Sequence, residues 1–217
     1  MSITGKDLKG LFKLLSQRMQ EGRNELSALD RAIGDGDHGV TMAVGWTAVC
    51  DALESLKDPN IASVFRTAGT SFLRAVGATV GPLYATGLFD MAVWCNDRTR
   101  LDGDDVVPLF EVFIGGLTRR GHAEVGQKTM MDTWIPAYKA LYDVWSLDPK
   151  GAVQVALEAA EVGCLSTQDM LAVQGRAGRL GERSRGHQDP GARSALMLFE
   201  TTVYWLQLSP EQRDYGL

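Results

Sequence analysis

Apolar side chains recur along most of this chain at the spacing of an amphipathic helix. Positions i, i+3, i+4 and i+7 are apolar over residues 8–19, and the same period returns over 106–117 and 134–145. This period places apolar side chains on one face of a helix, whereas a half-buried strand needs strict alternation. Alternating segments bounded by turn pairs are scarce, so the pattern predicts an all-α protein.

Several helix starts are marked by a capping side chain followed by proline, at Asp148-Pro149, Asp189-Pro190 and Ser209-Pro210. Aspartate and serine accept hydrogen bonds from the free N–H groups of a first turn, and proline fits the first helical position. We predict an antiparallel bundle of about eight helices forming a single domain over residues 1–217. The predicted helices cover 5–28, 40–56, 61–76, 82–97, 104–120, 128–146, 149–177 and 190–207.

The longer connections between these helices, 29–39, 77–82, 121–127 and 178–189, hold ten of the 24 glycines. In an antiparallel bundle, successive connections alternate between the two ends. These four follow the first, third, fifth and seventh predicted helices, so all four are expected at the same end. The pattern therefore favours a site assembled from several connections.

The connection at 29–39 places three carboxylates and an imidazole among glycines. Asp30, Asp35 and Asp37 offer oxygen ligands, and Mg²⁺ usually takes one or two carboxylates and completes its octahedron with water and phosphate oxygens. His38 is predicted to bond a phosphate or to orient a carboxylate. A solvated turn rich in aspartate and glycine stays open as the alternative.

Two further connections suit phosphate. The segment 77–82 breaks one helix and starts another, so its backbone N–H groups and the Thr79 hydroxyl suit an anion. The segment 175–191 carries four arginines among five glycines, and guanidinium groups match phosphate oxygens. Taken alone, the segment 77–82 is more typical of an ordinary helix break, and the segment 175–191 is equally compatible with a solvated loop.

Charge and cysteine content narrow the class of protein. A net charge of −5 and a pI near 5.2 give no electrostatic footprint for nucleic acid or an anionic membrane. Cys50, Cys95 and Cys164 are odd in number and lack metal-type spacing. With no signal-peptide pattern at the N-terminus, we expect a cytoplasmic protein with reduced thiols.

Taken together, four ordered blocks of residues make the chain resemble the nucleotide-binding L subunit of dihydroxyacetone kinases. The resemblance implies an eight-helix antiparallel barrel with a nucleotide, ADP or ATP, at one end, and two Mg²⁺ ions bridging its phosphates to three aspartates. The blocks are 29–39, 81–84, 126–132, and 175–192 from Gly175-Arg176-Ala177 to Gly191-Ala192.

The family's site residues carry over to matching positions here. The metal ligands match Asp30, Asp35 and Asp37, and the predicted catalytic set adds His38 and Arg176 to them. The nucleotide contacts match His38, Gly39, Val40, Thr41, Thr79, Val80, Gly121, Met130, Arg176, Asp189, Pro190 and Gly191.

Two departures from the family pattern concern the same site. Val80 stands where the family usually has serine, which removes a hydroxyl that would face the phosphates. Gly178-Arg179 replaces the usual Ser-Tyr after Gly-Arg-Ala. These changes bear on nucleotide affinity and on the choice of sugar.

The resemblance implies a kinase subunit that passes a phosphoryl group to a small ketose held by a separate K subunit. The donor is either consumed ATP or bound ADP recharged by a protein of the phosphotransferase system, and we favour the second. A homodimer stays open. Two alternatives remain: a non-catalytic nucleotide-binding adaptor, which Val80 favours, and a metal-dependent phosphohydrolase.

Overall fold

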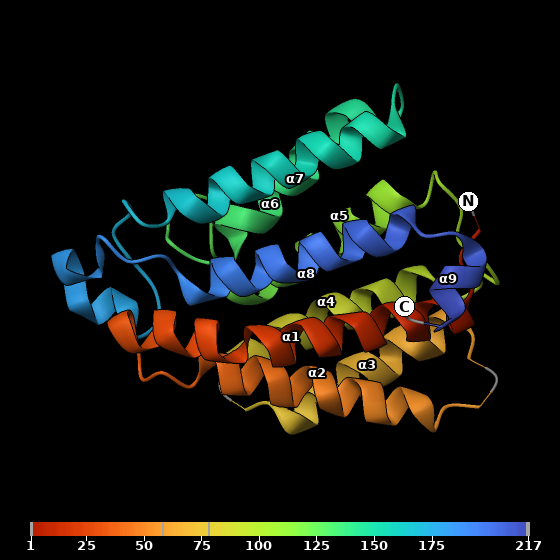
Figure 1. Ribbon diagram of the computed structural model, residues 1–217, viewed down its shortest axis with the longest axis horizontal. Coiled ribbons are helices and arrows are strands. Elements are labelled where there is room, and N and C mark those ends of the chain that lie inside the picture. The colour runs from red at the N-terminus through yellow and green to blue at the C-terminus, as the bar shows by residue number, and fades with distance from the viewer. Residues whose placement is uncertain (1, 58, 78, 216–217) are drawn as a thin grey trace. The chain divides into compact units, whose positions relative to one another are not determined.

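The computed structural model describes residues 2–57, 59–77 and 79–215. Among these residues all regular secondary structure is helical. The β-type pairing is limited to one isolated bridge between Ile3 and Leu101. The prediction of an all-α fold is therefore confirmed (Figure 1). In the described part of the chain, no helix is long and apolar enough to cross a membrane.

The described residues contain nine α-helices and one 3₁₀ helix, η1. In chain order they are α1 (Gly5–Ile33), α2 (His38–Glu54), α3 (Ile61–Ala75), α4 (Val80–Trp94), α5 (Val106–Gly121), α6 (Met131–Trp145), α7 (Pro149–Ser166), η1 (Ala177–Ser184), α8 (Pro190–Gln207) and α9 (Pro210–Tyr215).

The helices fall into two compact units. Unit 1 comprises residues 1–18, 43–122 and 204–217, and unit 2 comprises residues 19–42 and 123–203. Helices α1, α2 and α8 each contribute residues to both units. The single domain expected over residues 1–217 stays a prediction.

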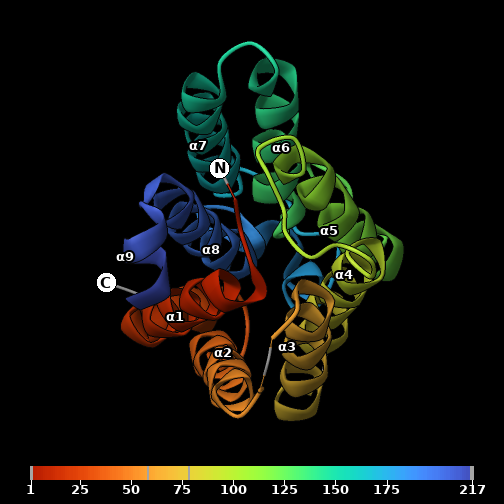
Figure 2. The ribbon, with the colours of Figure 1, turned by 90° about the vertical axis from the view of Figure 1, so that its right-hand side faces the viewer.

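Aromatic side chains form the core of unit 1. Helix α4 packs against α3 and α5, as both ribbon views show (Figures 1 and 2). The rings of Trp46 and Phe72 lie 5.2 Å apart, and Tyr84 lies 5.6 Å from Phe72. Tilted aromatic pairs at such distances add to the free energy gained from burying their large apolar surfaces.

Unit 2 is built around the antiparallel pair α6 and α7, which run side by side in both views (Figures 1 and 2). A side chain at Gly163 of α7 would place its Cβ 2.0 Å from the carbonyl oxygen of Asp132 in α6. Glycine is therefore required for this close approach of the two helices. Trp134 of α6 meets Phe199 of α8 edge to face, with ring centroids 6.1 Å apart.

Two predicted helix ends differ most from the structure. Helix α1 continues to Ile33 rather than ending at residue 28, and α7 ends at Ser166 rather than at 177. Beyond Ser166 the N–H groups of Gln168, Asp169 and Met170 donate to carbonyls three residues back, which tightens the chain out of the α-helix. The predicted loop 178–189 contains most of η1. The helix start predicted at Ser209-Pro210 is confirmed, because α9 begins there, although the predicted helix ranges stopped at residue 207.

Candidate functional site: an acidic cluster beside the start of α8

Asp30, Asp35 and Asp37 come together in unit 2. One oxygen from each carboxylate lies within 4.8 Å of the others, and no other group of three or more metal-ligating side chains occurs among the described residues. Asp30 is buried, whereas Asp35 and Asp37 are exposed. The cluster therefore has a closed side at Asp30 and an open side toward solvent.

Local backbone geometry explains why these residues converge. Asp30 lies in the last turn of α1, which ends where the Gly34 N–H donates to the Asp30 carbonyl. A Cβ at Gly34 would lie 2.1 Å from a carboxylate oxygen of Asp30, so a larger residue there would displace that carboxylate. Gly36 has φ +80°, a left-handed conformation that turns the chain back toward α2.

The spacing of these oxygens fits a divalent cation of the size of Mg²⁺. Two oxygens on opposite sides of one Mg²⁺ ion lie about 4.2 Å apart, because each Mg–O distance is about 2.1 Å. The 4.8 Å limit of the cluster is only slightly wider. Carboxylate oxygens are also the ligand type that this ion prefers, so Asp30, Asp35 and Asp37 are the residues that would hold it.

Arg176 lies next to the open side of the cluster. Its guanidinium forms an ion pair with Asp35, and its Nη1 lies 3.8 Å from Asp37 Oδ2. Partial burial, followed by the negative charge of Asp35, raises the pKa of Asp37, and Arg176 opposes this shift. The cluster thus concentrates negative charge that one arginine only partly neutralises.

His38, the first residue of α2, is buried. Its backbone N–H donates to Asp30 Oδ2 at 3.2 Å, and its Nε2 lies 2.9 Å from Ser194 Oγ. Burial lowers the pKa of His38 to about 4, with the Asp30 charge and a hydrogen bond to the Pro190 carbonyl opposing the shift. His38 is therefore a neutral side chain that links the acidic cluster to α8, and its predicted bond to a phosphate stays a prediction.

The first turn of α2 passes very close to α1 within unit 2. A Cβ at Gly39 would lie 1.9 Å from the carbonyl oxygen of Arg23. Val40 is exposed at this turn, and the Thr41 N–H donates to the Asp37 carbonyl at 2.9 Å. Gly39, Val40 and Thr41 thus stand directly beside the acidic cluster, and their contact with a nucleotide stays a prediction.

The start of α8 is held by a second group of polar contacts. The Asp189 carboxylate accepts from the Ala192 N–H at 2.7 Å and caps the helix, as the Asp-Pro signal predicted. Burial raises the pKa of Asp189 to about 7, although the N–H groups of Ala192 and Gly191 and the charge of Lys128 oppose the shift. The backbone of Met130 passes close by, because a Cβ at Gly191 would lie 3.6 Å from its nitrogen.

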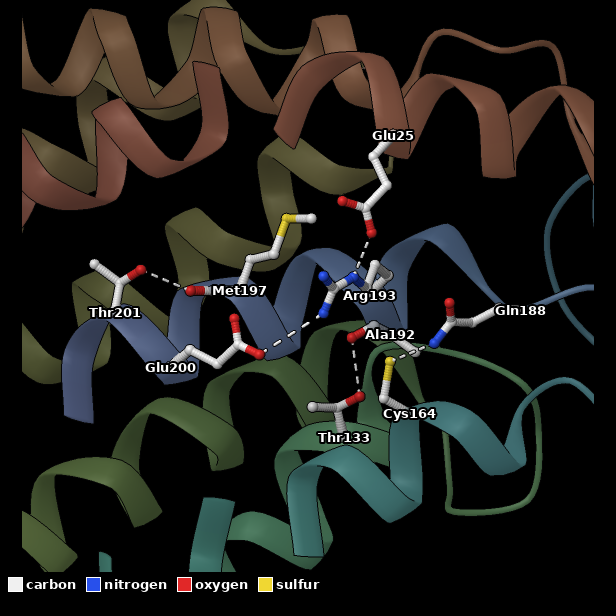
Figure 3. A network of polar contacts seen from close by, with 9 residues as sticks. All are labelled: Glu25, Thr133, Cys164, Gln188, Ala192, Arg193, Met197, Glu200 and Thr201. Carbon is white, nitrogen blue, oxygen red and sulfur yellow. Dashed lines mark hydrogen bonds and ion pairs between the residues drawn. The ribbon is translucent and has the colours of Figure 1, made fainter. Parts of the chain in front are cut away.

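Figure 3 shows how α8 is tied to its neighbours in unit 2. Thr133 of α6 donates to the Ala192 carbonyl at 3.0 Å, and the Gln188 amide donates to Cys164 Sγ at 3.0 Å. Arg193 pairs with Glu25 of α1 at 2.6 Å and lies 3.7 Å from Glu200. These contacts hold the first turn of α8, which carries Pro190 and Gly191, two of the predicted nucleotide contacts.

The other predicted nucleotide contacts belong to unit 1. Thr79 precedes α4, Val80 begins it, and Gly121 ends α5. Ala78, in the same connection as Thr79, lies outside the described residues. The assignment of Thr79, Val80 and Gly121 to nucleotide binding stays a prediction from the resemblance.

Two residues of this region were given no role by the sequence patterns. Ser194 bonds His38, but a serine four residues after Pro190 carries no signal of its own. Lys128 is only 3% exposed, and its ammonium lies among backbone carbonyls and carboxylates. Nothing in the sequence indicated that Lys128 is buried, because a lysine in a predicted helix is normally a solvated surface residue.

Comparisons with known proteins identify the family of this chain. Residues 32–204 match the family model described as DAK2 domain. The chain is 39% identical to the Listeria innocua protein "PEP-dependent dihydroxyacetone kinase 1, ADP-binding subunit DhaL", over 86% of this chain and 89% of that one. It is also 39% identical to the corresponding ADP-binding subunit of Escherichia coli, over 81% of this chain and 84% of that one.

A solved structure shares the fold. It is the dihydroxyacetone kinase from C. freundii in complex with AMP-PNP and Mg²⁺, with a TM-score of 0.71 and 25% sequence identity. The match covers 90% of this chain but only 33% of that one, so this protein spans about a third of the solved kinase. The resemblance inferred from the residue blocks is confirmed: this chain belongs to the DAK2 domain family, together with the DhaL subunits of dihydroxyacetone kinases.

Proposed function

We propose that this protein is the nucleotide-binding subunit of a dihydroxyacetone-type kinase and transfers a phosphoryl group from a bound nucleotide to a small ketose. The observation that carries the proposal is the convergence of Asp30, Asp35 and Asp37 in a chain of this family. Relatives of similar length are described as ADP-binding subunits, which supports ADP as the resident nucleotide.

Phosphoryl transfer needs in-line positioning and neutralisation of charge more than covalent chemistry. Bound Mg²⁺ would supply positive charge at the phosphate oxygens, and two ions would be held by the three aspartates. Arg176 forms an ion pair with Asp35 of the same cluster. When a nucleotide binds, its guanidinium would leave Asp35 and bind a phosphate oxygen instead. His38 would keep Asp30 oriented through its backbone N–H.

The acceptor sugar would be held by another protein. We propose a ketose-binding K subunit as that partner and a phosphotransferase-system protein as the donor that recharges bound ADP. The names of the relatives support this choice, since they refer to PEP-dependent and PTS-dependent kinases with ADP-binding subunits. A cytoplasmic location is supported by three cysteines that form no disulfide, Cys50, Cys95 and Cys164.

One alternative keeps a specific observation in its favour. Val80 begins α4 at a position where the family usually supplies a hydroxyl, so an adaptor that binds nucleotide without turnover would tolerate it. A hydrolase, by contrast, would release inorganic phosphate without any partner. Three assays separate these functions: ADP binding, phosphate release and ketose phosphorylation.

The decisive experiment is reconstitution. The purified protein is mixed with a K subunit and the phosphotransferase-system donor proteins, and phosphorylation of dihydroxyacetone and of L-erythrulose is followed. We expect turnover only in the complete mixture, because proximity of donor and acceptor accounts for about 7–11 kcal/mol of such a barrier. Nucleotide binding without turnover in any mixture would favour the adaptor, and partner-independent phosphate release would favour the hydrolase.

A further inference from the structure

Lys128 is a buried lysine outside the acidic cluster. It is 3% exposed and has φ 60°, a left-handed conformation that residues other than glycine seldom adopt. His122 is the other non-glycine residue with positive φ among those described. Such a conformation persists only where surrounding contacts hold it, so the environment of the Lys128 side chain is informative.

The Lys128 ammonium joins two separate segments of the chain. It donates to the carbonyl oxygen of Thr167, at the end of α7, and to that of His187, two residues before the cap of α8. Burial lowers the pKa of Lys128, and the charges of Asp189, Asp169 and Asp132 oppose the shift. Carbonyl acceptors and carboxylates together compensate an ammonium that has left water.

Further bonds extend this connection to the first turn of α8. The Asp189 N–H donates to Thr167 Oγ1 at 3.0 Å, and the Gly186 N–H donates to the Gln168 carbonyl at 2.8 Å. The Asp189 carboxylate in turn accepts from the Ala192 N–H. The segment 186–192 is therefore attached to the end of α7 at several points, with Lys128 bonded to both.

Lys128 is held in its own turn by Asp132. The buried Asp132 carboxylate accepts from the N–H groups of Gly126 at 2.5 Å and Thr129 at 2.7 Å. This arrangement fixes the backbone on both sides of Lys128 and leaves its side chain directed inward. Met130, two residues later, lies next to Gly191.

We propose that Lys128 is a positioning residue: by binding the Thr167 and His187 carbonyls, it holds the Asp189–Gly191 turn and Met130 in the geometry that receives a nucleotide. The inference rests on the proposed function, since both elements are nucleotide contacts by family resemblance. Lys128 itself need not touch the nucleotide. A turn ordered in advance binds more tightly because less conformational freedom is lost on binding.

The test compares Lys128→Met with Lys139→Met, a matched control at an exposed lysine of α6. Amide hydrogen exchange is measured on the nucleotide-free proteins, and ADP affinity with Mg²⁺ is measured by calorimetry well below each melting temperature. We expect Lys128→Met to accelerate exchange in 165–170 and 186–192 and to weaken ADP binding by roughly tenfold or more. Exchange in 28–38 should stay as in the unchanged protein. In Lys139→Met, both the amide exchange and the ADP affinity should match those of the unchanged protein.

Two results would overturn the proposal. One is wild-type exchange in 186–192 together with unchanged ADP affinity in Lys128→Met. The other is a uniform acceleration over all of unit 2, which would mean that Lys128 contributes only to general stability. If the unchanged protein binds no ADP, the proposed function fails, while the exchange comparison still decides whether Lys128 orders this turn.

A second variant guards against a Lys128→Met protein that does not fold. Thr167→Val removes the hydroxyl that accepts from the Asp189 N–H but keeps the shape of the side chain. It should produce the same local exchange pattern and a weaker ADP affinity. Unchanged exchange in 186–192 for Thr167→Val would count against the connection between α7 and the turn.

Discussion

Asp30 occupies a position on α1 that is electrostatically unfavourable for a carboxylate. The last turn of a helix carries partial negative charge, so an anion there is destabilising unless a positive group compensates it. The His38 N–H supplies part of that compensation. Asp30 is thus a buried acid at a helix end, beside two further carboxylates. This is the single-residue feature that most directly indicates a bound cation.

Asp189 leads to a prediction about pH. Because burial raises its pKa from 3.8 to about 7, the folded protein binds this proton more tightly than the unfolded chain does. The protonated Asp189 side chain therefore contributes fully to the free energy of unfolding below pH 4. As the pH rises toward 7, this contribution is lost, which lowers the free energy of unfolding by up to about 4 kcal/mol. Asp189→Asn mimics the protonated side chain, so its stability should not show this loss.

The measurement is urea unfolding of the nucleotide-free protein from pH 4 to pH 8. The two proteins should be similar at pH 4, and Asp189→Asn should be the more stable at pH 8. Asp148→Asn is the matched control, because Asp148 caps α7 before a proline in the same way but is exposed. Parallel pH profiles for Asp189→Asn and the unchanged protein would show that the carboxylate titrates as it does in water.

At the scale of elements, glycine determines how closely helices approach in unit 2. A Cβ at Gly39 would collide with the backbone of α1, and one at Gly163 would collide with the backbone of α6. Backbone atoms cannot rotate away as a side chain can. The first turn of α2, with Asp37 just before it, is therefore placed by its contact with α1.

We predict that Gly39→Ala lowers the free energy of unfolding by about 1–3 kcal/mol, the usual cost of overpacking, and weakens binding of ADP with Mg²⁺. Thermal unfolding and calorimetry measure the two effects. Gly103→Ala is the control, since a Cβ there meets nothing within 4 Å and its stability should change little. A Gly39→Ala protein with wild-type stability would mean that α1 and α2 separate without cost.

At the scale of the whole molecule, charge leads us to expect that nucleotide binding depends on a metal. The chain carries a net charge of −5, and the cluster adds three carboxylates where phosphates are expected. Two like charges 4 Å apart repel by about 4 kcal/mol at an effective dielectric constant of 20. Without a cation, the phosphates of ADP would meet that repulsion directly.

We therefore predict that EDTA weakens ADP binding by tenfold or more in calorimetry. Excess ligand stabilises a folded protein by about 2.7 kcal/mol at a hundred times its dissociation constant, so ADP with Mg²⁺ should raise the melting temperature. Asp35→Asn should abolish that rise, whereas Asp51→Asn, at an exposed position of α2, should keep it. Equal ADP affinity with Mg²⁺ and with EDTA would remove the aspartates from the metal role.

Local signals in the sequence determined much of this protein. Apolar periods and caps such as Asp148-Pro149 predicted the helices and most of their starts, because each depends on residues within one or two turns. The cluster of Asp30, Asp35 and Asp37 was also foreseen, since the three lie within eight residues of one another. The ordered blocks made the family recognisable as well.

Tertiary structure decided what depends on residues distant in the chain. The helix α7 ends at Ser166, where the sequence carries no cap or proline signal, whereas Gly34 does mark the end of α1 at Ile33. The burial of His38 beside Ser194 and of Lys128 against Thr167 and His187 arises from partners 39 to 156 positions away. Such contacts determine which polar side chains leave water, because desolvation depends on the whole packed environment rather than on neighbours in the sequence.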